Sequence, residues 1–263
     1  MNRIDQVFSN RQKNLLNVYF TAGYPELGDT LRIATALDQH GADFIEIGVP
    51  FSDPVADGPT IQGSSETALA NGMTLALLFE QLATLRKHVS VPVLLMGYIN
   101  PILQYGFERF CQKCQEVGID GLILPDLPMY EYQTHYKAVL AEYGLYNIFL
   151  ISPQTGEGRI REIDEHSQGF IYMVSSAAIT GARSNISGDQ EAYFQRINDM
   201  SLKRNLLIGF GISNHETYAK ACRYANGAII GSAFIRQLKK DSSEKAIKNF
   251  IKNIKNPNLS SSL

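Results

Sequence analysis

Short, almost continuously apolar runs recur along the chain, and amphipathic stretches separate them. A strand that is buried on both faces of a parallel sheet has this pattern. Between the runs, apolar residues recur at helical spacing, as Leu31, Ala34 and Leu37 do. The pattern therefore predicts eight β-strands alternating with helices, over residues 16–21, 43–49, 91–97, 121–124, 147–152, 169–175, 205–209 and 227–230.

Eight parallel β-α units are enough to close the sheet into a barrel. The alternative is an open doubly wound sheet, which commonly carries a GxGxxG turn after its first strand. The first predicted strand instead runs into Ala22-Gly-Tyr-Pro25. A length of 263 residues also suits a single α/β barrel. We predict a single-domain (β/α)8 TIM barrel over residues 1–255, with an extra short N-terminal helix and a flexible tail over 256–263.

Composition narrows the function classes. A hydrophobic fraction of 44% excludes disorder, and a net charge of -2 gives no reason to expect nucleic acid or an anionic membrane as a partner. The apolar run 91–99 is too short to span a bilayer, and the charged N-terminus is not a signal peptide. We expect a cytoplasmic protein, or an organellar one if a transit peptide has been removed.

Cysteine and histidine give no sign of a metal or redox site. Cys111 and Cys114 form a lone CxxC inside a helix-like stretch, where this spacing is that of neighbours on one helix face. A zinc site would need a second Cys or His pair. The five histidines are scattered, and none forms a ligand pair with another. We therefore predict no metal.

Two acidic residues are candidates for catalysis. Glu46 stands inside an apolar strand, where a carboxylate is unfavourable unless it is paired, protonated or facing a polar cavity. The structural alternative is an ion pair with a Lys or Arg across the barrel. The next loop, 50–59, is rich in proline and carries Asp53 and Asp57. We interpret Asp53, which precedes a proline, as a turn or structural residue, and Asp57 as a general base.

Glycine-bearing turns follow the late strands, at 179–182, 209–213 and 230–233. Barrels commonly bind phosphate in the loops after strands seven and eight, where glycine and a helix N-terminus present backbone N–H groups. The alternative is that these are ordinary loop glycines. No lysine lies in a predicted strand, so a Schiff base is not expected and non-covalent acid–base chemistry is favoured. The predicted phosphate-binding residues are Gly181, Gly211, Gly231 and Ser232.

Several segments together resemble the tryptophan synthase alpha chains. They are Glu46-Ile-Gly-Val-Pro-Phe-Ser-Asp-Pro-Val-Ala-Asp-Gly-Pro-Thr-Ile-Gln62, Tyr19-Phe-Thr-Ala-Gly-Tyr-Pro25, Met96-Gly-Tyr-Ile-Asn-Pro101, Pro125-Asp-Leu-Pro128, Thr180-Gly181, Gly209-Phe-Gly-Ile-Ser213 and Gly231-Ser232. The first is long and specific, and the segments extend from residue 19 to 232 in the family's order.

The resemblance implies an enzyme of tryptophan biosynthesis that splits indole-3-glycerol phosphate into indole and glyceraldehyde 3-phosphate. It implies that Glu46 protonates the indole ring carbon and that Asp57 takes or stabilises the indole N–H proton. One carboxyl would be a protonated acid in an apolar strand, and the other an ionised base on a solvated loop. The phosphate-binding residues match the family's backbone positions. The implied indole pocket comprises Tyr19, Tyr98, Tyr172, Thr180 and Phe210.

The resemblance also implies a partner. Indole would pass to a β subunit in an α2β2 heterotetramer, with pyridoxal phosphate in that partner and no cofactor in this chain. The catalytic face, with loop 50–59 and segment 100–107, would be the docking surface. Three alternatives remain open: another phosphate-binding barrel, a stand-alone lyase, and a catalytically silent barrel that activates a β subunit. The presence of both Glu46 and Asp57 argues against the silent barrel.

Overall fold

The apolar runs form parallel strands in the computed structural model, which describes residues 1–174, 188–209 and 211–256. The strands follow the order β5-β4-β3-β2-β1-β9-β8-β7-β6 around the sheet. Their bounds are β1 (Leu15–Thr21), β2 (Phe44–Gly48), β3 (Val93–Met96), β4 (Gly121–Ile123), β5 (Tyr146–Ile148), β6 (Leu150–Ile151), β7 (Phe170–Val174), β8 (Asn205–Gly209) and β9 (Gly227–Ile230). The predicted parallel α/β barrel is confirmed, and the open sheet is excluded by the closure described next.

The barrel closes at Phe149, the single residue between β5 and β6. β5 pairs with β4, β6 pairs with β7, and the Tyr172 N–H donates to the Phe149 carbonyl at 2.9 Å. The two ends of the sheet are therefore consecutive parts of one chain segment. The sequence predicted one strand over 147–152. That prediction was wrong in detail, because the segment changes its hydrogen-bonding partner partway along.

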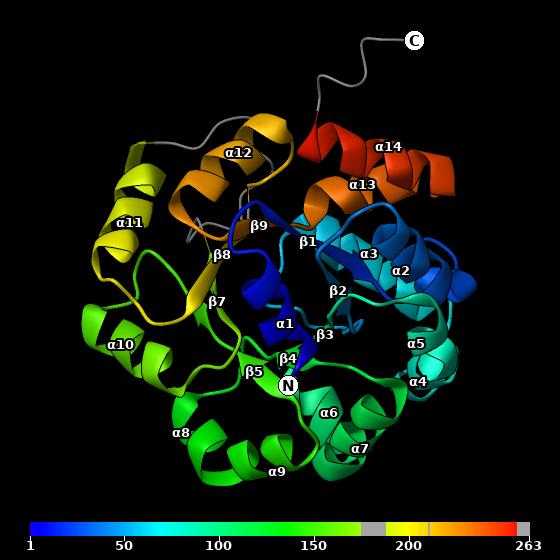
Figure 1. Cartoon of the computed structure of the whole chain (residues 1–263). Helices are drawn as coiled ribbons and strands as arrows, with labels where there is room; N and C mark the ends of the chain where they lie inside the picture. The colour runs from blue at the N-terminus through cyan, green and yellow to red at the C-terminus, as the bar shows by residue number, and fades with distance from the viewer. Residues whose placement is uncertain (175–187, 210, 257–263) are drawn as a thin grey trace.

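Helices surround the barrel on the outside (Figure 1). They are α1 (Arg3–Asn10), α2 (Thr30–Gln39), α3 (Pro59–Ala70), α4 (Leu75–Gln81), α5 (Leu85–His88), α6 (Ile99–Tyr105), α7 (Phe107–Val117), α8 (Met129–Glu131), α9 (Lys137–Glu142), α10 (Glu157–His166), α11 (Gly188–Asp199), α12 (His215–Tyr224), α13 (Ser232–Lys240) and α14 (Glu244–Lys255), with the short 3-10 helices η1 (Leu27–Asp29) and η2 (Leu82–Thr84) and the π-helix η3 (Tyr132–Tyr136). Cys111 and Cys114 are buried free thiols on α7, as the helix-face interpretation predicted.

The predicted N-terminal helix is α1, and it lies across one end of the barrel (Figure 1). Asn2 caps it by accepting a hydrogen bond from the Ile4 N–H at 2.9 Å. The Phe8 ring lies 5.5 Å from Phe44 and 6.2 Å from Phe170, between ring centroids. Phe44 and Phe170 are the first residues of their strands. The three aromatic rings therefore fill the barrel end opposite to the βα loops.

In the part of the chain that the structure describes, no single helix is long and apolar enough to cross a membrane. One bent pair, α3 with the segment Leu75–His88, passes that test of length and composition only when its two halves are taken together. The helix α14 ends at Lys255, and residues 257–263 of the predicted tail lie outside the described residues.

Candidate active site

Glu46 lies in the middle of β2 and is fully buried. Register places it between Tyr19 of β1 and Leu94 of β3. The side-chain amide of Asn17, two residues before Tyr19 on β1, donates to Oε1 of Glu46. Within the described residues Oε2 has no hydrogen-bond partner, and no Lys or Arg pairs with this carboxyl. The ion-pair alternative therefore finds no support in the described part of the barrel.

Burial decides the protonation state of Glu46. Removing a carboxyl from water disfavours its charged form, and this raises the pKa of Glu46 from 4.5 to about 8, while the hydrogen bond from Asn17 opposes the rise. The group is consequently a neutral acid at pH 7. It can donate a proton to a substrate, which is the protonation state expected of an acid in an apolar strand.

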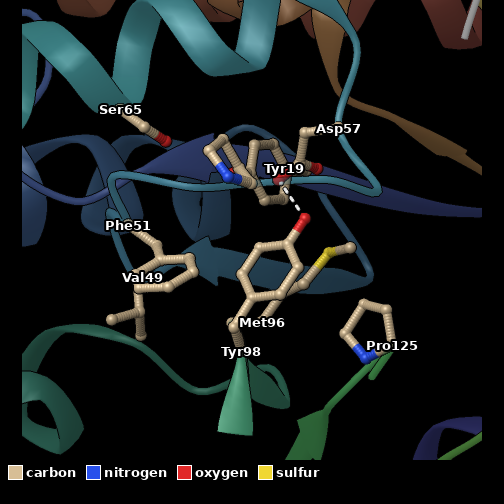
Figure 2. Close-up of a pocket in the computed structure, with 10 residues that line it drawn as sticks. Tyr19, Val49, Phe51, Asp57, Ser65, Met96, Tyr98 and Pro125 are labelled. Carbon is tan, nitrogen blue, oxygen red and sulfur yellow. Dashed lines mark hydrogen bonds between the residues drawn. The ribbon is translucent and has the colours of Figure 1, made fainter. Parts of the chain in front are cut away.

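Asp57 lies near the end of the loop between β2 and α3, and hydrogen bonds fix it there. The Tyr98 hydroxyl donates to Oδ2 of Asp57 at 3.0 Å and accepts from the Ala56 N–H at 2.9 Å. The Gln62 amide donates to the Asp57 carbonyl at 2.8 Å. Figure 2 shows Tyr98 reaching from the end of β3 to this loop. One tyrosine hydroxyl thus orients both the catalytic candidate and the backbone beside it.

The solvated position predicted for Asp57 was wrong, because the side chain is only 7% exposed. Burial raises the pKa of Asp57 from 3.8 to about 6, and the Tyr98 hydrogen bond opposes this rise. The carboxyl is still mostly ionised at pH 7, so the predicted role of base survives the correction.

Asp53 of the same loop is exposed and accepts from the Ser52 hydroxyl at 2.5 Å, which agrees with a turn role.

A pocket at the carboxyl ends of β1, β2 and β3 brings Tyr19, Tyr98 and Asp57 together (Figure 2). Its lining comprises Tyr19, Val49, Phe51, Pro54, Asp57, Ser65, Met96, Gly97, Tyr98 and Pro125. Glu46 is not part of this lining. The pKa values of Tyr19 and Tyr172 are raised by burial first and then by the charges of both Glu46 and Asp57, so the two phenols stand near both acids.

Two glycines make room for these phenols, a role that the sequence analysis assigned to neither. A Cβ atom at Gly48 would overlap the hydroxyl of Tyr19, and one at Gly209 would overlap the hydroxyl of Tyr172. Each glycine ends a strand beside the strand of its tyrosine. A glycine at the end of an apolar strand was the available signal, because it commonly marks a close approach of another group.

Some of the predicted phosphate-binding residues are among the residues that the structure describes. Gly231 is the N-cap of α13 and Ser232 its first residue, as the sequence predicted. A Cβ at Gly231 would lie 3.5 Å from the Tyr19 ring, so this helix N-terminus borders the pocket. Gly211 has φ +76°, which residues other than glycine rarely adopt. Thr180, Gly181 and Phe210 lie outside the described residues.

No group of three His, Cys, Asp or Glu side chains suited to a metal occurs in the described ranges.

Comparison with known proteins agrees with the motifs. The family model described as tryptophan synthase alpha chain matches residues 6–261. The chain is 56% identical to the tryptophan synthase alpha chain of Flavobacterium johnsoniae over 255 residues, covering 97% of this chain and all of that one. It is 53% identical to the alpha chain of Bacteroides thetaiotaomicron over 248 residues, covering 94% and 97%.

Solved structures agree with the fold. The alpha subunit of Legionella pneumophila tryptophan synthase superposes with a TM-score of 0.86 at 34% identity, covering 97% of each chain. Mycobacterium tuberculosis tryptophan synthase gives 0.84 at 28% identity, covering 97% of this chain and 98% of that one. By the family match along nearly its whole length, the chain belongs to the tryptophan synthase alpha chain family.

Proposed function

We propose that this chain is the α subunit of a tryptophan synthase and cleaves indole-3-glycerol phosphate into indole and glyceraldehyde 3-phosphate. One observation carries the proposal. A neutral acid, Glu46, and an ionised base, Asp57, both stand near Tyr19 and Tyr172, with the pKa of the first raised to about 8 and that of the second to about 6. Carboxyls whose pKa values are separated by their environments can divide the acid and base roles.

The proton balance of the reaction fits these two groups. Glu46 gives its proton to the ring carbon that bears the glycerol chain, and the ring nitrogen becomes cationic. Asp57 accepts the hydrogen bond of that N–H and stabilises its charge. The carbon–carbon bond then breaks, its electron pair returns to the ring, and the adjacent hydroxyl becomes the aldehyde. The proton of that hydroxyl goes to the carboxylate of Glu46, which restores the acid.

The phosphate of the substrate would bind at the N-terminus of α13, where Gly231 and Ser232 present backbone N–H groups beside the pocket. Gly211 would approach it from the loop after β8, and Gly181 would complete the site. Binding energy from this remote group holds the reacting carbon in place.

We expect Gly211→Val to raise KM for the substrate and to leave kcat nearly unchanged, because the phosphate does not react. Weakened binding of glycerol phosphate in a titration measures the same effect. Valine at φ +76° also strains the loop, so the matched control is Gly144→Val, at φ +69° in the loop before β5 at the other end of the barrel. If both variants bind glycerol phosphate equally well, the phosphate assignment fails.

We propose a pyridoxal-phosphate-dependent β subunit as the partner, in an α2β2 assembly that docks the catalytic face. Large apolar side chains are exposed in the three successive βα segments that follow β2, β3 and β4: Val55 at 76%, Leu103 at 45% and Tyr130 at 71%. Ile102, which lies in the segment 100–107 implied for docking, is 2% exposed and packs into the core. A grouping of apolar residues on one face is typical of an interface.

Titrating the cognate β subunit while recording indole release tests this proposal. We expect release to rise at saturation, because docking at the 50–59 loop would favour the arrangement that holds Asp57, and we expect the affinity for a substrate analogue to rise about 5- to 150-fold. Tyr130→Ser should weaken β-subunit binding. Leu69→Ser, which removes a 37% exposed apolar residue near the far end of α3, should not.

The same titration separates the remaining alternatives. A stand-alone lyase would release indole at its full rate without the partner. A silent barrel would release none under any condition while still activating the β subunit. A cytoplasmic location remains a prediction from the sequence, as does the absence of a cofactor in this chain.

A further inference from the structure

Asn17 is a buried polar side chain on β1, the strand beside that of Glu46. It lies on β1, pairs with Phe44 of β2 and Ile229 of β9, and is fully buried. An amide in such a place is unfavourable unless its polar atoms are hydrogen-bonded. The hydrogen bond that the structure gives it is the one from Nδ2 to Oε1 of Glu46, and its Oδ1 has no partner among the described residues. The acid is thereby held from one side only.

We infer that Asn17 is a positioning residue that directs the acidic proton of Glu46 onto Oε2. This inference rests on the proposed function, in which Glu46 is the proton donor. A neutral carboxyl has one O–H and one carbonyl oxygen, and an amide N–H donates to the carbonyl oxygen. Because Oε1 receives the N–H, the O–H belongs on Oε2. Among the described residues Oε2 has no partner, so its proton is free to be given to the substrate.

The surroundings of Glu46 make Asn17 the dominant polar contact. Toward the far end of the barrel, the Phe44 ring packs edge-to-face against Phe170 at 5.7 Å between centroids, so the side chains below the acid are apolar. Tyr19 on β1 and Tyr172 on β7 are the titratable groups that face the acid, and burial raises the pKa of both phenols, so they are uncharged. No charged side chain in the described part of the chain pairs with Glu46 and competes with the amide.

Asn17 has a predictable effect on both the rate and the pH profile. A donor to the carboxyl stabilises the ionised form more than the neutral one, so its loss must raise the pKa of the acid. The O–H would also no longer be confined to Oε2. A merely structural role for Asn17 predicts neither change.

The test is Asn17→Leu, which keeps the side-chain size and removes the amide. We expect kcat for indole release to fall about tenfold or more, with KM little changed, since the carboxylate that forms when Glu46 gives up its proton loses one hydrogen bond. We expect the basic limb of the pH profile to move up by about one unit. The matched control is Asn147→Leu on β5, whose amide is 2% exposed and unpaired within the described residues. It should leave the profile unchanged.

A titration of the Glu46 carboxyl by carbon-13 NMR, without substrate, tests the contact independently of activity. Its signal is assigned by its loss in Glu46→Gln. A higher pKa in Asn17→Leu supports the inference, and an unchanged or lower one overturns it, a lower one meaning that the amide accepts the acid's proton instead. If the wild-type chain releases no indole, the proposed function fails while the titration still decides the contact. Should Asn17→Leu not fold, Asn17→Ala replaces it in both measurements.

Discussion

Glu46→Gln is expected to abolish indole release while leaving the fold and the binding of glycerol phosphate intact. The amide has nearly the shape of the acid but has no acidic proton to give to the ring carbon. General acid catalysis typically contributes about 10²–10⁴-fold, so turnover should fall by at least that order. The measurement is kcat for indole release, with the cognate β subunit at saturation. Retention of more than about a tenth of wild-type turnover, a barrier change below about 1.4 kcal/mol, contradicts the assignment of Glu46.

Thermal unfolding at several pH values provides the control for this variant. The pKa of Glu46 is about 8 in the folded chain and has its ordinary value of 4.5 when exposed. Between these values the folded chain holds a proton that the unfolded chain has released, so the free energy of unfolding falls as pH rises from about 4.5 to 8. Glu46→Gln removes this dependence. Its melting temperature should therefore be no lower than that of the wild type at pH 8, which separates lost chemistry from lost structure.

The order of strands and helices was predictable because each strand is buried on both faces and therefore appears as a separate apolar run. What the runs could not show is where a strand changes partner. The change at Phe149 happens inside a continuous apolar segment, and nothing in the type of that residue marks it. Pairing depends on the register of neighbouring strands, which is a property of the closed sheet rather than of the segment.

The two candidate acids were predictable for different reasons. Glu46 was visible because a charge in an apolar strand needs an explanation. Asn17 carries the same signal in the preceding strand, but only the strand register shows that its amide meets Glu46, 29 residues away. Likewise, the burial of Asp57 follows from Tyr98, which reaches the loop from β3. Contacts between residues distant in sequence were therefore the main part of the site that the sequence could not supply.

Asp57→Asn is expected to remove the acidic limb of the pH profile. In the wild type, activity should rise as Asp57 ionises, with a pKa of about 6, and should fall as Glu46 loses its proton, with a pKa of about 8. The profile of kcat/KM is then bell-shaped between these values. Asparagine accepts a hydrogen bond but carries no charge, so it cannot stabilise the cationic ring nitrogen. We expect a loss of about 10²-fold or more at pH 7, with the basic limb left in place.

Asp53→Asn is the matched control, because it makes the same change in the same loop at an exposed position. It should keep both limbs and nearly the full rate. The contrast isolates the charge of Asp57, because Tyr98 can still donate to the asparagine oxygen and hold the loop. If Asp57→Asn keeps the acidic limb near pH 6, another group titrates there and Asp57 is not the base. Loss of that limb with the limb near pH 8 intact would assign the two carboxyls their separate roles.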